Sequence, residues 1–255
     1  MKGLKTYVIN LESSYRRKQH MTDLLNPYPF LDVEFIKAID GRQLSEQECV
    51  SSFDNEACMK HIGRLLNRGE IGCTLSHYAC YKALLEGKEK YALILEDDIA
   101  PIRDLKEMEN YDWDKWLDTD KPIVLFLSGD FWYYKRKSVV SVFDAVGAYA
   151  FFINRSAASL MLSLGVPYSV ADAWYLYRRK GLKLKAVLPY MIDANLNMAD
   201  LPSDVAQDIW GQDRKNMTIK NLLLTCCDSM VKKLLRSIGH FERKIRIINN
   251  VIVSD

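Results

Sequence analysis

The stretch Tyr91-Ala-Leu-Ile-Leu-Glu-Asp-Asp98 is an apolar run that ends on three consecutive acids. A continuous run of Ala, Leu and Ile is typical of a strand buried on both faces of a parallel sheet. In open α/β sheets, ligands bind in the crevice outside the carboxyl ends of such strands. The sequence therefore predicts a sheet with a polar site where this strand ends.

The acids that end this run suit a divalent cation. Glu96 and Asp98 are two residues apart, so on extended chain they point the same way, roughly 6.6 Å from each other. Carboxylate oxygens are the ligands that Mg²⁺ and Mn²⁺ prefer, and the pair can hold one cation against a diphosphate. Acids also end strands simply because the chain reaches water, or because they cap a helix. The pattern alone leaves both interpretations open.

Strands and helices alternate along the chain. Apolar or β-prone runs predict strands at 7–11, 33–39, 91–95, 123–127, 147–153 and 182–188. Helical periodicity and capping residues predict helices at 15–25, 71–85, 156–164 and 172–180. This alternation predicts an α/β fold with a mostly parallel sheet flanked by helices.

Composition places the chain among ordinary globular proteins. It is 49% hydrophobic and 27% charged. Its six cysteines form no CxxC pair and no zinc-type spacing, which is typical of a reducing compartment. The apolar run near Met1 is too short for a signal peptide, and no apolar run is long enough to span a membrane. We therefore expect a cytoplasmic protein.

The C-terminal part differs in charge from the rest. Residues 211–250 carry nine Lys and Arg against three Asp and Glu, a net charge of +6, whereas the whole chain carries +2. Within it, one helical face of residues 219–238 is apolar, with Ile219, Leu223, Met230, Leu234 and Ile238. Such a basic amphipathic helix can lie on an anionic membrane, or its apolar stripe can pack on the domain or on a second subunit.

Several segments together resemble glycosyltransferase family 25, whose bacterial members extend lipopolysaccharide or lipooligosaccharide chains. The matching segments are Val8-Ile-Asn-Leu11 with Arg16-Arg17, Ala38-Ile-Asp-Gly41, Gly69-Glu-Ile-Gly-Cys-Thr-Leu-Ser-His77, Ile94-Leu-Glu-Asp-Asp98 and Gly147-Ala-Tyr-Ala150. The most specific feature is the Gly-Glu-Ile-Gly-Cys-x-x-Ser-His segment followed by Leu-Glu-Asp-Asp. The resemblance implies a GT-A-type, Rossmann-like domain over residues 1–212, a UDP-sugar donor, usually UDP-galactose, and inversion at the anomeric carbon. Residues 213–255 then form a basic helical tail.

The resemblance also implies roles for individual residues. Asp98 becomes the first metal contact, with Glu96 and Asp97 on the metal or the ribose, and the cation is Mn²⁺ or Mg²⁺. Donor-binding positions would be Asn10, Leu11, Arg16, Arg17, Ser76, His77, Gly147 and Ala148. An Arg fork matches phosphate geometry, although a solvated helix face is an equally ordinary explanation for Arg16 or Arg17. Ser76 and His77 either bind donor or support the site.

An inverting displacement needs a carboxylate base for the acceptor hydroxyl. Asp172 follows the acidic motif by about 75 residues, where GT-A enzymes commonly place that base. A helix N-terminus there would tend to keep it ionised. Helix capping, which Ser169 can also perform, is the structural alternative for Asp172. Asp130, after its own strand, is the reserve candidate.

One departure from the pattern concerns the metal. Many GT-A enzymes add a late histidine ligand, but the histidines here are His20, His61, His77 and His240. Asp193, Asn195, Asn197 or Ser203 can substitute, or the site uses fewer protein ligands.

The aromatic cluster Trp132-Tyr133-Tyr134 suits an acceptor site. Aromatic faces stack on sugars, and the neighbouring Lys135-Arg136-Lys137 can meet acceptor phosphates. Packing of the same loop on the core is the alternative.

The sequence therefore predicts a metal-dependent, inverting glycosyltransferase of bacterial type. It would add a hexose, most simply galactose, to a lipid-linked oligosaccharide at the inner face of the cytoplasmic membrane. UDP-glucose and UDP-N-acetylhexosamine are alternative donors, and a catalytically silent binding module of the same fold is the rival from another class. A methyltransferase would want glycines where Asn10-Leu-Glu-Ser-Ser14 stands, and nucleic-acid binding lacks interleaved aromatics.

Overall fold

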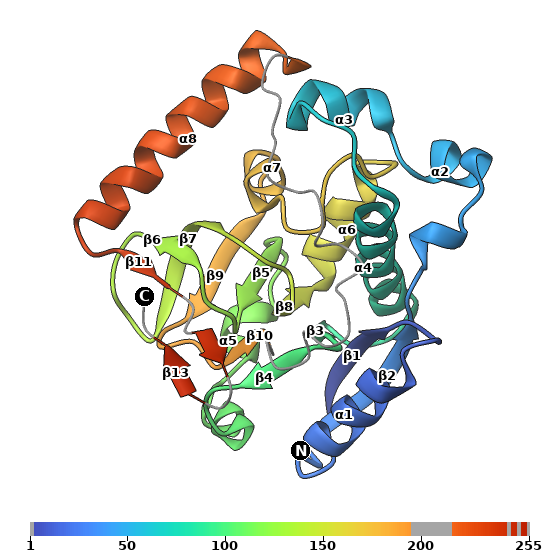
Figure 1. Ribbon diagram of the computed structural model, residues 1–255. Helices are drawn as coiled ribbons and strands as arrows, with labels where there is room; N and C mark the ends of the chain where they lie inside the picture. Colours follow the sequence, from blue (N-terminus) through green and yellow to red (C-terminus); the bar gives the residue numbers. More distant parts are fainter. Residues whose placement is uncertain (1–2, 195–215, 244–245, 249–250, 254–255) are drawn as a thin grey trace.

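The computed structural model describes residues 3–194, 216–243, 246–248 and 251–253. They form a nine-stranded sheet of order β11-β6-β7-β9-β5-β8-β3-β1-β2 (Figure 1). Its strands are β1 (Leu4–Asn10), β2 (Leu31–Lys37), β3 (Tyr91–Glu96), β5 (Ile123–Phe126), β6 (Phe131–Tyr133), β7 (Val139–Ala145), β8 (Ala150–Asn154), β9 (Lys183–Val187) and β11 (Phe241–Glu242).

Six of the nine strands point the same way, namely β2, β1, β3, β5, β9 and β6, and three run against them. One of the three, β8, lies between β3 and β5 and is antiparallel to both. The expected α/β class, with one large and mostly parallel sheet flanked by helices, is confirmed. The carboxyl ends of β1, β3 and β5 consequently share one edge, where ligands of such sheets bind.

Helices cover both faces of the sheet. They are α1 (Tyr15–Leu25), α2 (Glu46–Ser52), α3 (Asn55–Ile62), α4 (Arg68–Glu86), α5 (Asp114–Leu117), α6 (Arg155–Ser163), α7 (Trp174–Arg179) and α8 (Ile219–Ser237), with 3₁₀ turns at Gly41–Gln43 and Leu105–Asn110. Short strands β4 (Ile99–Pro101) and β10 (Ile192–Ala194) pair with each other, as do β12 (Arg246–Ile248) and β13 (Val251–Val253). No helix in the described ranges combines the length and the apolar character that a membrane crossing requires.

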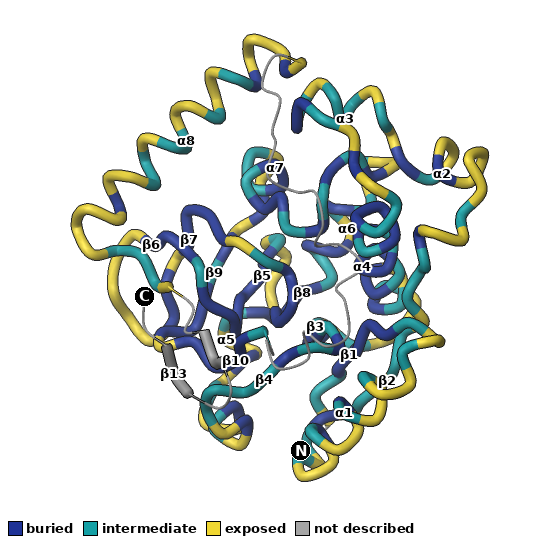
Figure 2. The backbone as a smooth tube through the Cα atoms, viewed as in Figure 1, coloured by how far each residue is buried: buried dark blue, intermediate teal, exposed yellow. Residues whose placement is uncertain are grey.

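The core divides into two layers because strand side chains alternate. Ile94 packs with α4, α6 and α7 residues on one face, whereas Leu93 and Leu95 pack with α1 and the segment 105–117 on the other. All five residues of β8 are buried, so the centre of the sheet is dark in Figure 2. Burial on both faces is why the central strands read as continuous apolar runs.

The helix α4 carries the segment that the sequence singled out. It begins at Arg68, three residues earlier than expected, because Asn67 and Glu70 form a reciprocal capping box. Glu70 is buried and also pairs with Arg64, at 2.6 Å. At the other end, Arg155 donates to the carbonyls of Leu84 and Leu85, at 2.7 and 2.8 Å. Both ends of α4 are therefore held by ionic side chains.

The helix α8 packs Leu235 against Trp132 of β6 and forms ion pairs with α7 and β7. Asp228 accepts from Arg178 and Arg179, and Lys232 pairs with Asp144 at 2.8 Å. The predicted apolar stripe faces solvent, so its packing on the described domain is ruled out (Figure 2). The predicted boundary at residue 212 lies outside the described residues.

Candidate active site at the carboxyl ends of β1 and β3

A cleft of about 450 Å³ opens where β1 and β3 end. Its wall comes from the turn after β1, the turn after β2, one side of α4 and the acidic motif. The lining residues that matter below are Leu11, Arg16, Arg17, Cys73, Ser76, His77, Glu96, Asp97 and Asp98. This volume falls in the range of small-molecule sites, and the position matches the edge expected from the sheet.

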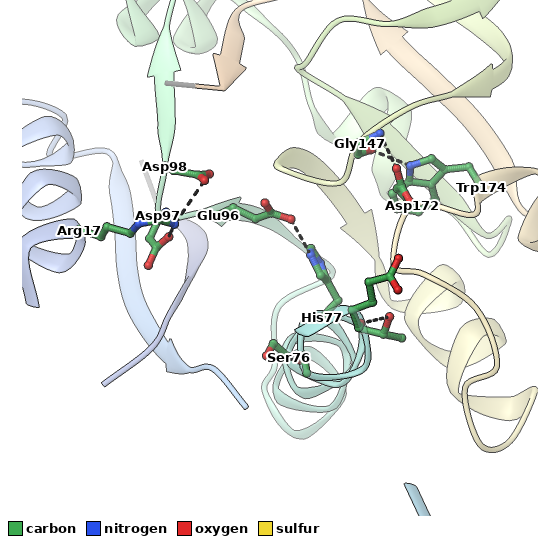
Figure 3. Close-up of polar contacts among 12 residues, drawn as sticks. Arg17, Ser76, His77, Glu96, Asp97, Asp98, Gly147, Asp172 and Trp174 are labelled. Atoms are coloured by element: carbon green, nitrogen blue, oxygen red, sulfur yellow. Dashed lines mark hydrogen bonds and ion pairs between the residues drawn. The ribbon is translucent and has the colours of Figure 1, made fainter. Parts of the chain in front are cut away.

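The three acids have different neighbours. Glu96 ends β3 and contacts His77 Nε2 at 3.1 Å (Figure 3). Asp97 accepts from Asn10 Nδ2 at 2.7 Å and from Arg17 at 2.9 Å, and Asp98 lies 3.3 Å from the same Arg17 nitrogen. The chain turns after Glu96, so the extended-strand geometry expected for Glu96 and Asp98 does not apply. Because the chain turns here, β1 and α1 can contact Asp97 while α4 contacts Glu96.

The acids repel one another in this cleft. Burial and the nearby Glu96 carboxylate raise the pKa of Asp98 to about 7, although Arg17 acts in the opposite direction. Burial also raises the pKa of Asp97 despite its bonds to Arg17 and Asn10. A bound cation would relieve this repulsion, because it favours the ionised form of each carboxylate. The donor set thus fits Mn²⁺ or Mg²⁺, with Asp98 and Glu96 as the residues that would hold it.

Asp172 lies on the opposite side of Glu96 from Asp98 (Figure 3). Its Oδ2 accepts from the Gly147 backbone N–H at 2.9 Å, and Trp174 Nε1 donates to the Gly147 carbonyl at 2.8 Å. The helix α7 begins at Trp174, and its N-cap residue Ala173 makes no side-chain cap. The Asp172 side chain therefore does not cap α7. Burial raises the pKa of Asp172.

Gly147 holds this arrangement in place. Its φ is +84°, and a Cβ there would come within 2.4 Å of the Tyr149 ring. The expected strand over 147–153 therefore begins only at Ala150, after a glycine-dependent loop. Ala148 is buried among core residues, so its side chain packs inward.

The helix α4 contributes a second polar group to the cleft. Cys73 and His77 stand one helical turn apart, and Cys73 Sγ, a His77 ring nitrogen and a Glu96 oxygen all lie within 4.8 Å of one another. The His77 ring stacks on Phe151, and its Nδ1 is buried with no hydrogen-bond partner among the described residues. Burial and the nearby Glu96 carboxylate raise the pKa of the Cys73 thiol well above its usual value. Sequence reasoning missed Cys73, although its i, i+4 spacing to His77 was a usable signal.

Ser76 has a supporting contact rather than a free hydroxyl. Its Oγ accepts from the Ile39 N–H at 2.8 Å and donates to the Gly72 carbonyl at 2.7 Å. A Cβ on Gly72 would meet the Ile39 carbonyl at 2.5 Å, so α4 can approach the turn after β2 only through a glycine. Of the two predicted uses of Ser76, the structure shows support of the cleft wall.

The predicted arginines differ in their surroundings. Arg17 is paired with Asp97 and Asp98, so it offsets part of the negative charge of the motif. Arg16 is exposed on the cleft rim, with its guanidinium 6.0 Å from the Tyr15 ring centroid. Asn10 is buried and uses its amide on Asp97 and on the Ser14 carbonyl, while Leu11 lines the cleft.

Known proteins are similar to the first half of the chain. A model of glycosyltransferase family 25, described as an LPS biosynthesis protein, matches residues 4–125. The chain is 39% identical over 99 positions to a "Glycosyltransferase 25 family member" of Aedes aegypti, and 30% identical over 97 positions to "Procollagen galactosyltransferase 2" of Homo sapiens. Residues 4–125 are thus similar to glycosyltransferase family 25.

The family 25 similarity covers part of each protein. It spans 36% of this chain, but only 16% of the Aedes aegypti relative and 15% of the human one. Among solved structures, the inositol-1-phosphate CTP transferase from T. maritima aligns over 90% of this chain with a TM-score of 0.41 and 10% identity. The whole acidic motif and the cleft lie inside the family 25 region, whereas Gly147 and Asp172 lie beyond it.

The reserve base and the substitute ligands sit apart from the cleft lining. Asp130 occupies the turn between β5 and β6 with φ +63°, and its carbonyl accepts from Val146. Asp193 is buried and accepts from Tyr190 Oη at 3.1 Å and from the Ala194 N–H. Asn195, Asn197 and Ser203 lie outside the described residues.

The expected sugar-stacking role is wrong for two of the three aromatics. Trp132 and Tyr133 belong to β6 and are buried, with Trp132 packed near Leu235 of α8. Alternation along a strand explains why the run Phe131-Trp-Tyr133 reads as a cluster but is divided between two layers. Tyr134 is exposed, and its contact with an acceptor stays a prediction.

Proposed function

We propose that this chain is an inverting, metal-dependent glycosyltransferase that moves a hexose, galactose in the first instance, from a UDP-sugar to a saccharide acceptor. The observation that carries the proposal is the acidic motif at the end of β3. It lines a cleft large enough for a nucleotide sugar and contains a carboxyl group, Asp98, whose pKa is raised to about 7. The name of the human relative, a galactosyltransferase, supports galactose as the donor sugar.

Each half of the cleft has a proposed task in donor binding. Asp98 and Glu96 would hold Mn²⁺ or Mg²⁺, and such an ion supplies charge neutralisation for a departing diphosphate. His77 donates from Nε2 to Glu96 and so fixes the direction of that carboxylate. Asn10 and Arg17 hold Asp97, which keeps the turn of the motif rigid. Arg16 on the rim can bind a phosphate oxygen pair.

Asp172 is the proposed base. A hydroxyl nucleophile must lose its proton as it attacks, and a base is most effective when its pKa approaches the working pH. Burial raises the pKa of Asp172 in that direction. The Gly147 N–H fixes one carboxylate oxygen, so the other is available to accept the proton.

A lipid-linked oligosaccharide is the proposed acceptor, and the inner face of the cytoplasmic membrane is the proposed location. The description of the matched family, LPS biosynthesis, supports this acceptor. The relatives named above are animal proteins, and a protein-linked acceptor is the competing outcome. Offering both acceptors to the same enzyme preparation separates the two.

Thermal unfolding with nucleotide sugars tests the donor site. We expect one of UDP-galactose, UDP-glucose or the UDP-N-acetylhexosamines to raise Tm by about 5–10 °C at a hundred times its Kd, only with Mn²⁺ present. Asp98→Asn should abolish this shift, while Asp23→Asn, on the exposed side of α1, should keep it. No shift with any nucleotide would reject the enzyme and favour a binding module of the same fold.

A further inference from the structure

The helix α8 turns its main apolar stripe away from the domain. Its inward side makes several polar contacts: Asp228 pairs with Arg178 and Arg179 at 2.7 and 2.6 Å, and Asn221 Nδ2 donates to the Lys60 carbonyl at 2.8 Å. Leu235 is the buried apolar residue of this side and packs with Trp132 and Phe143. Lys232 pairs with the buried Asp144. A surface helix normally turns its apolar stripe to the core. Here ion pairs fix the opposite orientation, because rotating the helix would leave these buried charges unpaired.

The outward side of α8 is apolar along its whole length. Ile219, Leu223, Met230 and Leu234 recur at helical spacing and are 61–78% exposed, and Ile238 follows at 56%. A helix of 19 residues is about 28 Å long, so the stripe is a continuous ridge rather than a scattered set. Figure 2 shows α8 as the most exposed long helix of the molecule, at the end of the sheet opposite α1. Extended apolar surface of this kind marks an interaction site.

Charge selects the kind of partner. Lys220 and Lys233 are exposed and flank the apolar stripe on its two sides, whereas the one acid of the helix, Asp228, faces inward. The Arg236 guanidinium lies over the Phe241 ring, so it packs on the domain and does not flank the stripe. A second copy docked symmetrically on this ridge would bring these lysines against their equivalents. An anionic lipid surface would instead accept the apolar ridge between headgroups and pair with both lysines.

We propose that the outer face of α8 lies on an anionic bilayer, with Leu223, Met230 and Leu234 in the headgroup–acyl boundary. This inference deepens the proposed membrane location, and its test does not depend on sugar transfer. The domain side of α8 stays folded against β6, so the protein docks through a preformed ridge rather than through a helix that forms on binding.

Vesicle flotation of the full chain tests the apolar ridge. We expect binding to phosphatidylglycerol vesicles and weaker binding to phosphatidylcholine vesicles. The double variant Leu223→Glu/Met230→Glu should bind at least about tenfold more weakly, since two apolar groups that enter the membrane become charged. Both side chains are exposed, so Tm should stay unchanged. The matched control is Val50→Glu, which alters an equally exposed apolar side chain on α2 and should bind like wild type.

The lysines are tested separately. Lys220→Ala and Lys233→Ala should each weaken binding to phosphatidylglycerol by about fivefold at low salt, whereas Lys88→Ala, in the turn after α4, should have no effect. The proposal would be overturned if the wild-type protein does not bind vesicles, or if the Leu223→Glu/Met230→Glu variant binds them as well as wild type. Self-association in sedimentation velocity that the double variant abolishes, without vesicle binding, would assign the ridge to a second copy. Vesicle binding without any response to UDP-sugars would leave this inference standing and reject the proposed enzyme.

Discussion

The helices α4 and α8 are both 19 residues long, and each departs from the usual distribution of side chains in an opposite way. α4 buries polar residues, including Glu70, Ser76 and His77, whereas α8 exposes Leu223, Met230 and Leu234. Buried polar groups are usually hydrogen-bonded, and a contiguous exposed apolar surface usually marks an interaction site. The two exceptions therefore mark two different surfaces, a cleft for a small polar ligand and a ridge for an apolar one.

The largest effect should come from the cleft side. Asp172→Asn removes the proposed base while keeping the Gly147 contact geometry, and we expect kcat to fall by about 10²–10⁴ with donor binding retained. Steady-state kinetics together with the nucleotide thermal shift measure both parts.

Asp130→Asn is the matched control, because Asn also tolerates the positive φ at that turn. It should change kcat by less than about threefold, well below the contribution of a general base. The reverse ranking of the two variants would transfer the role of base to Asp130.

One leucine of α4 and one of α8 should differ strongly in their contribution to the free energy of unfolding. Leu84 is fully buried in the core, so Leu84→Ala should lower the free energy of unfolding by about 2–5 kcal/mol. Leu223 is exposed, so Leu223→Ala should change it by less than about 0.5 kcal/mol. Urea unfolding measures both, and a large loss in Leu223→Ala would mean that the ridge is covered in solution.

The smallest difference concerns two serines with the same local bond. Ser76 and Ser229 both donate to the carbonyl four residues earlier, at 2.7 and 2.8 Å. Only Ser76 also accepts from a backbone N–H, that of Ile39, so Ser76→Ala leaves that donor unpaired and should cost about 1–3 kcal/mol. Ser229→Ala should cost less than about 0.5 kcal/mol in the same urea experiment.

The fold was predictable where periodicity is simple. The runs at 91–95 and 123–127 are buried on both faces, so their composition alone indicates central strands, and both are strands in the structure. The direction and position of β8 were not predictable, because a buried antiparallel strand has the same composition as a buried parallel one. For α8 the periodicity located the apolar face, but its direction depends on ion pairs with residues 178, 179 and 144.

The candidate site was predictable in its members more than in its contacts. The acidic motif, His77 and Asp172 were identified as residue types suited to the chemistry. The motif and His77 line one cleft, whereas Asp172 is not part of its lining. Their partners were not predictable, since the turn after Glu96 and the pairing of Arg17 with Asp97 depend on tertiary packing. Cys73 was overlooked because a lone cysteine in an apolar helix reads as a packing residue.

The insertion of β8 between β3 and β5 has a consequence for synthesis of the chain on the ribosome. The region that matches the family, residues 4–125, contains β3 and most of β5 but not the strand that joins them. Until Asn154 emerges, both strands present unpaired edges, and the Asn154 amide that binds the Leu117, Thr119 and Lys121 carbonyls is missing. We therefore expect an expressed fragment that ends at residue 125 to aggregate through the open edges of β3 and β5.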